Sequence, residues 1–267
     1  MKRLKDFASG IYIGLIGVLL YAPILVLMVL SFNDSRSPVV WKGFTLKWYS
    51  RLFSNSQIID PLVVTFILAL ASASIAVLIG VSGALGIHAL SRRKYKTMMA
   101  LTNIPMLNAD IVTGIALMLW FTHFIPLGFG SVLLAHITFN IPYVILCVMP
   151  RIQQTNISVY EASRDLGAGP VYGFFKVLLP ELVPGIISGF FMAFTMSMDD
   201  FVITYFTKGA GVDTLSTMLY GQRRKGIKPE MYALSTLIFL VVSVILLVAN
   251  RISDRRKTPK QEQTERI

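Results

Sequence analysis

The chain has 267 residues, of which 54% are hydrophobic and only 15% are charged, and its mean hydropathy is +0.65. Soluble domains carry about 25% charged residues, so this composition excludes an ordinary soluble domain and indicates a protein with several membrane spans. The single cysteine excludes an internal disulfide, and the three scattered histidines have no metal-ligand spacing.

Six mostly apolar runs follow one another along the chain, each close to the roughly 20 residues that a helix needs to cross a bilayer. The first follows the basic start MKRLK. Its length and the lack of a small-residue cleavage site favour a retained helix over a removed signal peptide. We therefore expect an all-α membrane protein with an N-terminal segment at 1–10, a transmembrane domain at 11–250 and a basic tail at 251–267. The expected transmembrane helices span residues 11–32, 62–89, 97–121, 130–149, 182–206 and 231–250.

Lysine and arginine are divided unevenly between the two sides of these helices. Sixteen of the 25 lie in the N-terminus, the loop SRRKYK, the loop from Arg151 and the tail, against nine on the other side. Because cytoplasmic loops are enriched in Lys and Arg, this predicts that both termini lie in the cytoplasm. The outer cluster Arg223-Arg224-Lys225 argues against this orientation, but it lies in a long segment, where the rule is weakest. The net charge of +11 thus reflects topology rather than nucleic-acid binding.

The outer segment WKGFTLKWYSRLF interleaves aromatic residues with three basic ones. Aromatic rings and basic groups together are typical of a short helix at the membrane surface. Two interpretations remain open: the segment anchors the chain to membrane lipids, or it docks a partner from outside.

The loop between the fourth and fifth expected helices contains NISVYEASRDLGAGPVYGFFKVLLPEL, which has helical signals of its own. Ser158 and Glu161 form a capping-box pattern that predicts a helix start, and Gly167 is placed to end that helix in a left-handed conformation. Pro170 suits the first position of a second helix, which Pro180 should bend or stop. We therefore expect a helix–turn–helix elbow from Ser158 to Pro180, with an amphipathic loop lying on the membrane as the alternative. The exposed apolar face of its first helix would consist of Val159, Ala162 and Leu166.

Within the elbow, Glu161-Ala162-Ser163 is followed after three residues by Gly167, and after nine more by Val177-Leu178-Leu179-Pro180. This spacing resembles the EAA loop of ABC-importer permeases, which reads E-A-A, three residues, G, nine residues, I, any residue, L-P. Ser163 stands where that pattern has alanine and Val177 where it has isoleucine, and both are similar in size. The resemblance assigns ATPase coupling to Glu161, Ala162, Ser163, Gly167, Val177, Leu179 and Pro180.

The likeness extends beyond the elbow. FTLKWY after the first expected helix, HITFNIPYV in the fourth and SMDDFVITYF in the fifth resemble the spermidine/putrescine importer permeases of the second-subunit type, over most of the chain. The resemblance implies a MetI-like ABC transporter permease fold in the bacterial cytoplasmic (inner) membrane. The partners that it implies are a homologous second permease chain in a heterodimer, a cytoplasmic ATPase dimer, an extracytoplasmic substrate-binding protein, a polyamine substrate and membrane lipids.

No glycine in the chain is followed by lysine, so the G-K-[ST] part of a P-loop is absent. We therefore expect no cofactor, metal site or catalytic residue in this chain, and ATP and Mg would be bound by the partner ATPase. By the resemblance, the elbow seats in a cleft of that ATPase and transmits its closure to the membrane helices. Small-residue pairs such as Gly185–Gly189 and Gly83–Gly86 allow close helix crossings, within the chain or between chains.

Three acids lie within the expected spans: Asp110 in the third, and Asp199 and Asp200 in the fifth. Acids inside a membrane usually face a cavity or an ion pathway, so we expect these three to lie on the path of a cationic substrate. Asp200 shares its helical face with a strip of small and polar residues, which favours it over Asp199 as the direct contact. A hydrogen-bonded structural role for Asp110, and salt bridges from the pair to a partner chain, remain alternatives. The strip consists of Gly189, Ala193, Ser197 and Thr204.

Two other classes of function fit part of the sequence. Asp110 with Asp200 would suit an intramembrane aspartyl protease, and a secondary transporter driven by an ion gradient would also place acids in its spans. Neither class gives the elbow a role. The prediction is therefore the permease subunit of an ATP-driven importer, with polyamines as the expected cargo and another small solute as the alternative.

Overall fold

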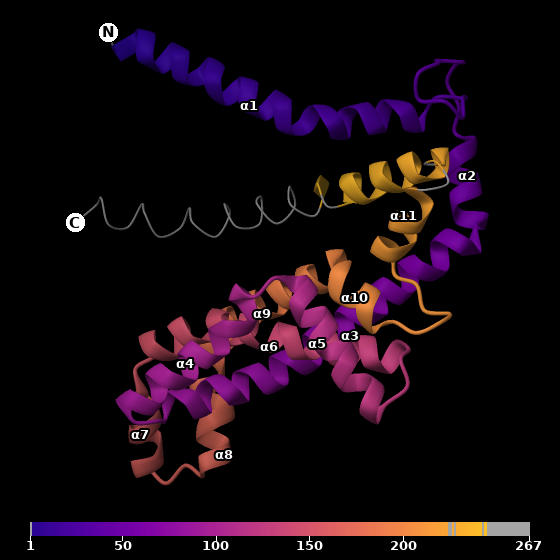
Figure 1. The fold of residues 1–267 in the computed structure, drawn as a ribbon. Coiled ribbons are helices and arrows are strands. Elements are labelled where there is room, and N and C mark those ends of the chain that lie inside the picture. The colour runs from indigo at the N-terminus through magenta and orange to yellow at the C-terminus, as the bar shows by residue number, and fades with distance from the viewer. Residues whose placement is uncertain (1, 224–225, 227, 242, 245–267) are drawn as a thin grey trace. The chain divides into compact units, whose positions relative to one another are not determined.

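The computed structural model describes residues 2–223, 226, 228–241 and 243–244. Within these residues the regular structure is helical, apart from one isolated β-bridge between Asn33 and Phe44. The chain divides into two compact units, Met1–Ile59 with Gln222–Ile267 and Asp60–Gly221 (Figure 1). The expected tail 251–267, the end of the sixth expected span and part of the outer basic cluster lie outside the described residues.

The first unit contains α1 (Lys2–Ser31) and α2 (Lys47–Ser54). In the described part of α1, the most apolar stretch contains no buried residue, as expected for a helix that is solvated by lipid. The loop after α1 folds around Asn33, whose side chain donates to the carbonyl of Val40 at 2.9 Å and accepts from the N–H of Lys42 at 3.0 Å. The indole of Trp48 donates to the Asn33 carbonyl at 2.7 Å, which fixes α2 against this loop.

The short helix predicted in the outer segment is confirmed as α2. Trp48 and Leu52 form its buried face. The cationic groups of Lys47 and Arg51 lie 4.6 and 5.3 Å from the centre of the Trp48 ring, and Phe53 is 66% exposed. Such a helix has the composition of a membrane-surface element, and its location at the lipid surface remains a prediction.

Among the described residues, four helices are long and apolar enough to cross a membrane, or five if one bent pair counts as a single span. The sixth expected span corresponds to a shorter apolar helix, Pro229–Val241. The all-α class is therefore confirmed, whereas six spans with cytoplasmic termini remain a prediction. The long helices are Gly10–Ser31, Ser56–His88, Phe129–Gln154 and Pro170–Asp199, and the bent pair is α4 (Arg92–Leu107) with α5 (Asp110–Phe124).

Two expected spans are broken rather than continuous. In the third, α4 and α5 meet at 100°, because the backbone becomes extended at Asn108 and Ala109. In the fifth, α9 (Leu179–Asp199) stops where Asp200 is extended, and the short α10 (Val202–Thr207) follows. The expected spans 97–121 and 182–206 are therefore each interrupted, the first at Asn108 and Ala109 and the second at Asp200.

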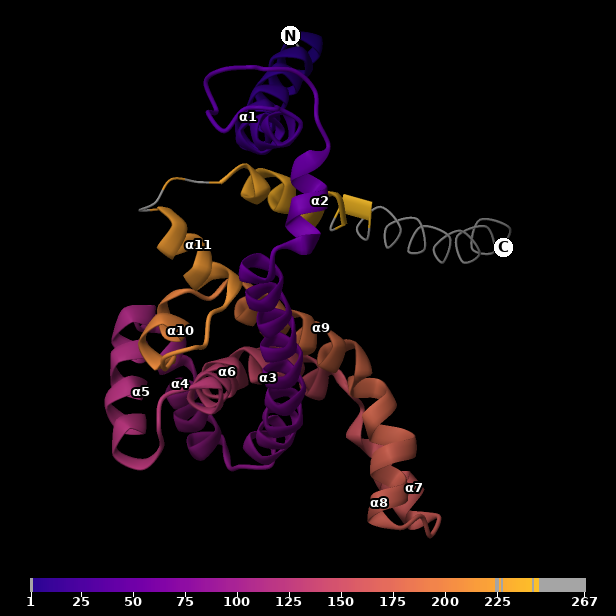
Figure 2. The same cartoon turned by 90° about the vertical axis from the view of Figure 1, so that its right-hand side faces the viewer.

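The second unit is built around α6 (Phe129–Gln154), which lies between α3 (Ser56–His88) and α5 in Figure 2. Glycines let the neighbouring helices approach it closely. A Cβ on Gly80 of α3 would lie 2.7 Å from Val144, and a Cβ on Gly189 of α9 would lie 3.3 Å from the same side chain. A Cβ on Gly185 would lie 2.9 Å from Arg151. The predicted role of Gly185–Gly189 in a close crossing is thus confirmed within the chain.

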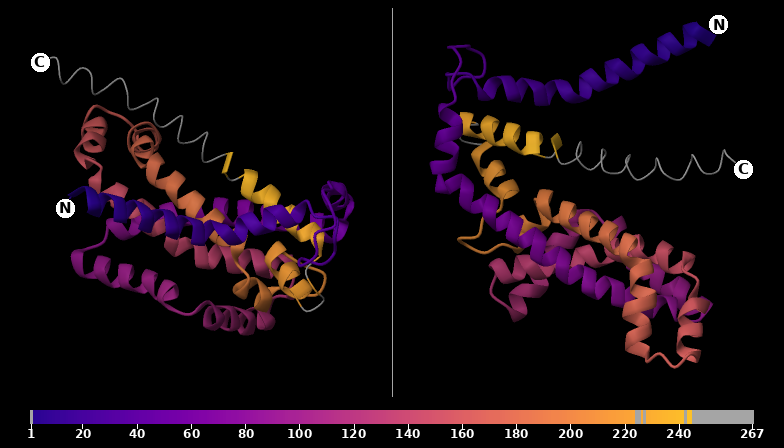
Figure 3. Two further views of the ribbon diagram at one scale, coloured as in Figure 1. Left: turned by 90° about the horizontal axis from the view of Figure 1, so that it is seen from above. Right: turned by 180° about the vertical axis from the view of Figure 1, so that it is seen from behind.

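The elbow forms α7 (Ile157–Asp165), α8 (Pro170–Gly173) and a π-helical turn, η1 (Phe174–Leu178). Figure 3 shows α7 and α8 side by side at one end of the second unit, away from α10. The unit therefore separates two features of interest: the elbow at one end and the α9–α10 break towards the other.

Candidate functional site

The first helix of the elbow begins earlier than the capping-box pattern predicted. Its N-cap is Asn156, whose side chain accepts the N–H of Ser158 at 3.1 Å. Ser158 is therefore inside α7, and its assignment as the cap is wrong. Asn156, two residues earlier, provides the same type of acceptor, so the helix begins after it.

The predicted end of α7 is confirmed. Gly167 has a φ of +90°, and its N–H donates to the carbonyl of Arg164 at 2.9 Å. The N–H of Ala168 donates to the carbonyl of Ser163 at 3.0 Å. These two bonds form a Schellman motif, which satisfies carbonyl groups in the last turn and turns the chain towards α8.

The two arms of the elbow touch at Gly173. A Cβ at this position would lie 3.0 Å from the ring of Tyr160 and 3.2 Å from the hydroxyl of Ser163. The Ser163 hydroxyl donates to the Tyr160 carbonyl at 2.7 Å, so it is satisfied within α7. A small side chain at 163 and none at 173 let the arms pack, which explains why serine serves in place of the alanine of the EAA pattern.

The other side of α7 faces outward. Val159 is 56% exposed and Leu166 is 89% exposed, and Glu161 and Ala162 are exposed beside them. Apolar side chains grouped with a charge on a protruding helix are typical of a surface that binds another protein. The predicted apolar face is thus present and uncovered within the described chain.

Pro180 does not stop the second arm, since α8, η1 and α9 continue as one helix over Pro170–Asp199. In η1 the N–H of Leu179 bonds to the carbonyl of Phe174, five residues back rather than four. A π turn of this kind places one extra residue in the helix just before the proline, which cannot donate. Of the two outcomes expected at Pro180, stopping the helix is wrong.

At the α9–α10 break, Asp200 lies one position before Phe201, the N-cap residue of α10, and its side chain caps the first turn of α10. Its carboxylate accepts the N–H groups of Ile203 at 3.2 Å and Thr204 at 2.8 Å, and the Thr204 hydroxyl at 2.7 Å. The Asp200 side chain is only 9% exposed. Three accepted hydrogen bonds compensate for taking this carboxylate out of solvent.

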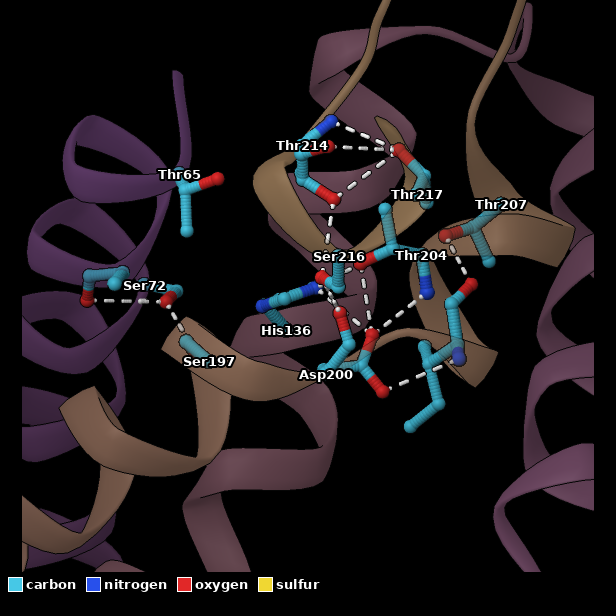
Figure 4. A network of polar contacts seen from close by, with 12 residues as sticks. Thr65, Ser72, His136, Ser197, Asp200, Thr204, Thr207, Thr214, Ser216 and Thr217 are labelled. Carbon is cyan, nitrogen blue, oxygen red and sulfur yellow. Dashed lines mark hydrogen bonds and ion pairs between the residues drawn. The ribbon is translucent and has the colours of Figure 1, made fainter. Parts of the chain in front are cut away.

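His136 of α6 completes the cap (Figure 4). Its Nε2 lies 2.9 Å from the Thr204 hydroxyl and 3.5 Å from the Asp200 carboxylate. Because Thr204 uses its own proton on Asp200, its oxygen accepts from His136, so the ring carries a proton on Nε2. Ser216 then donates to the Asp200 carbonyl at 2.7 Å and ties α11 (Leu215–Arg223) to the break.

A second buried cluster lies one turn earlier in α9. The Ser197 hydroxyl accepts from the Asn140 amide at 2.8 Å and lies 2.9 Å from the Ser72 hydroxyl. Ser72, Asn140 and Ser197 therefore join α3, α6 and α9 through side chains alone. All three are at most 2% exposed.

The small and polar strip on α9 was expected to border a substrate path, but its α9 residues are buried in the structure. Gly189, Ala193 and Ser197 are buried against α6 and α3, so this strip packs helices together. The opposite face of α9, which carries Ser188, Thr195 and Asp199, is the exposed one. The geometry therefore reverses the expected preference within the pair: Asp199 is accessible, and Asp200 is committed to the fold.

Asp110 lies at the first position of α5, directly after the bend, and its side chain is exposed. One turn later, a Cβ on Gly114 would lie 3.1 Å from Phe206 and 3.4 Å from the Cα of Ile203. The start of α5 and the helix capped by Asp200 are thus direct neighbours. The two breaks therefore lie in one region of the second unit.

His136, Asn140 and Tyr143, all in the stretch HITFNIPYV, were not among the predicted site residues. His136 and Asn140 are four residues apart and fully buried, so they serve the two polar clusters from one face of α6. Tyr143 is half-buried and lies within electrostatic range of Asp110. Polar residues spaced by one helical turn inside an apolar run were the available signal.

Long apolar helices, two broken spans and a protruding elbow are together typical of a membrane transport subunit. The chain belongs to the family of binding-protein-dependent transport system inner membrane components, whose profile matches residues 76–259. Members of this family are ABC-importer permeases, so the chain is a membrane-embedded permease subunit and not an enzyme. Such permeases work with a separate ATPase and a substrate-binding protein.

Curated relatives agree over nearly the whole chain. The spermidine/putrescine transport system permease protein PotC of Escherichia coli K12 is 36% identical over 240 residues, which cover 90% of each chain. The putrescine transport system permease protein PotI of the same organism is 34% identical over 238 residues, covering 86% of this chain and 85% of that one.

Solved structures show the same fold at low identity. A bacterial ABC transporter that imports the acidic polysaccharide alginate has a chain with a TM-score of 0.71 at 12% identity, covering 94% of this chain and 96% of that one. The methionine transporter MetNI in an inward-facing conformation gives a TM-score of 0.56 at 19% identity, covering 74% and 93%. The MetI-like permease architecture is thereby supported.

Proposed function

We propose that this chain is the permease subunit of an ATP-driven importer of polyamines such as spermidine and putrescine. The names of the relatives motivate the cargo. The observation that carries the proposal is the accessible carboxylate at each of two neighbouring helix breaks, Asp110 and Asp199. A linear polyamine carries ammonium groups separated by methylenes, so acids placed in succession would bind it in steps without trapping it.

In this proposal the two members of the acid pair have different roles. Asp199, on the exposed face of α9, contacts the cation. Asp200 positions the contact, because its cap fixes where α9 ends and where α10 begins. The same geometry argues against salt bridges from Asp200 to a partner chain, since its carboxylate is filled by Ile203, Thr204 and His136.

The elbow is the proposed coupling element. Glu161, Ala162, Val159 and Leu166 form the surface that would seat in a cleft of the cytoplasmic ATPase. Ser163 and Gly167 shape the elbow, and Val177, Leu179 and Pro180 connect it to α9. ATP and Mg would be bound by the ATPase dimer. This chain would have six membrane spans, with both termini in the cytoplasm. The second permease would be a related chain, and the binding protein would deliver the polyamine from outside.

Uptake of radiolabelled spermidine and putrescine tests the cargo. The chain is expressed with its ATPase, binding protein and second permease in a strain that lacks other polyamine importers. We expect ATP-dependent uptake of at least one of the two polyamines. An assembled complex that hydrolyses ATP but takes up neither would overturn the polyamine assignment and favour a permease for another small solute.

A further inference from the structure

Three aromatic rings gather directly after the proposed contact acid. They come from the break itself, from α10 and from α11, and we call Phe201, Tyr205 and Tyr220 the aromatic trio. The ring centres of Phe201 and Tyr220 are 4.6 Å apart, those of Phe201 and Tyr205 5.4 Å, and those of Tyr205 and Tyr220 6.2 Å. Side chains distant in sequence thus meet in one cluster.

The trio is not a closed stack. Its rings are inclined to one another by 36°, 37° and 68°, so none of the three pairs is a parallel stack. Tyr205 is 49% exposed, Tyr220 is 45% exposed and Phe201 is half-buried. Inclined rings with open faces are the arrangement that holds a cation against several rings at once.

The polar network described above fixes the positions of these rings. The Asp200 cap sets the direction of α10 and therefore of Tyr205, one residue beyond its partner Thr204. Ser216 bonds the Asp200 carbonyl, and Tyr220 follows Ser216 by one helical turn. A buried network that converges on the backbone between Asp199 and Phe201 thus holds all three rings before any ligand arrives.

An acid lies close to the trio in the sequence. Asp199 precedes Phe201 by two residues and has an exposed side chain. Lys208, the basic residue that follows α10, forms an ion pair with Asp213 and is largely neutralised. An exposed carboxylate two residues before partly exposed aromatic rings is complementary to an alkylammonium group, whose charge would meet the acid and whose methylenes would meet the rings.

We propose that the aromatic trio is a receiving site for the ammonium-bearing end of the substrate, next to the Asp199 contact. This inference rests on the proposed function and adds a second kind of recognition to it. Carboxylates alone would bind any cation, including metal ions. Aromatic rings favour organic ammonium groups over metal ions, because the apolar methylenes of the ligand also pack against the rings.

Progressive fluorination of one ring tests the proposal. Phenylalanine bearing one, two or three fluorines replaces Tyr220 by nonsense suppression, with Tyr220→Phe as the unfluorinated reference. Fluorine weakens the attraction of the ring for a cation while its size barely changes. We expect the KM for spermidine uptake to rise stepwise along the series. A KM that stays equal to that of Tyr220→Phe across the series would show that the ring of Tyr220 does not bind the cation.

Two substitutions extend the test. Tyr220→Leu and Phe201→Leu remove a ring each, and we expect each to raise KM by about threefold to thirtyfold, the span of cation–π strengths from exposed to desolvated sites. Phe124→Leu is the control, because Phe124 is 72% exposed on α5 and packs with Trp120 instead of the trio. An equal rise in KM for Phe124→Leu would mean that the trio is nothing more than lipid-facing surface.

The unaltered complex separates this inference from the proposed function. If it takes up no polyamine, the proposed cargo fails and the trio loses its ligand with it. If it takes up spermidine while the fluorinated series and the two leucine variants keep a normal KM, the cargo stands and the trio alone is rejected.

Discussion

Thr204 gives both of its donors to one side chain: its N–H and its hydroxyl bond the carboxylate of Asp200 at 2.8 and 2.7 Å. Removing that acceptor would leave the first turn of α10 without its cap and leave His136 buried beside it. We expect Asp200→Ala to destabilise the chain by about 1–2 kcal/mol, as loss of a helix cap does. Thermal unfolding of the purified complex measures this. Asp200→Asn keeps one acceptor oxygen, so its unfolding temperature should lie between that of the unaltered complex and that of Asp200→Ala.

Asp199→Asn should behave in the opposite way. Its side chain is exposed, so the change should leave the unfolding temperature within error of the unaltered complex. Loss of the charge at the proposed contact is expected to lower spermidine uptake by at least about tenfold, which corresponds to about 1.4 kcal/mol. Normal uptake by Asp199→Asn would reject a charge-dependent role.

Asp110→Asn, at the neighbouring break, should lower uptake in the same way without loss of stability.

Gly167→Val should uncouple transport. At a φ of +90° a β-branched residue is strained, so the Schellman turn of α7 should open and displace the exposed face. We expect normal membrane insertion but loss of substrate-stimulated ATPase activity. Gly169→Val is the matched control, because Gly169 has a φ of −61° and open space around its Cβ position. Equal stimulation in the two variants would refute the coupling role of the elbow.

Gly209→Ala tests how the loop after α10 meets the loop before α6. A Cβ at this position would lie 2.0 Å from the carbonyl oxygen of Leu127, a backbone atom that has no rotamer to change. The loop must therefore move, and we expect a clear drop in the unfolding temperature of the complex. Gly128→Ala, in the facing loop with nothing near its Cβ position, should cost far less. A similar drop in unfolding temperature for both variants would show that Gly209 and Leu127 are not in close contact in the membrane.

The sequence predicted the parts of this fold that depend on long apolar runs and on local turn signals. The elbow, the left-handed Gly167 and the close crossing at Gly185–Gly189 follow from patterns within a few residues. The break at Asp200 did not follow, because an aspartate in an apolar run has the same local pattern whether it lines a path or caps a helix. That choice depends on His136 and Ser216, which are 64 residues before it and 16 after it.

The strip of small residues on α9 is buried instead of bordering a path, for a related reason. A strip of small residues fits a narrow pathway and a close helix crossing equally well. Val144 of α6 lies against Gly189, and Ser72 of α3 bonds Ser197, so the strip belongs to a helix crossing. Neither partner is close to α9 in the sequence. Helical periodicity gives the angle between two faces, and only the tertiary packing tells which of them is covered.

The two helix breaks also present opposite electrical poles. α5 begins at Asp110, so its free N–H groups carry partial positive charge there and offset part of that carboxylate's charge. α9 ends at Asp199, so its last carbonyls add partial negative charge to that of the acid. A passing cation would therefore be held more firmly at Asp199 than at Asp110. Two identical side chains thus become unequal steps, graded by the direction of the helices that carry them.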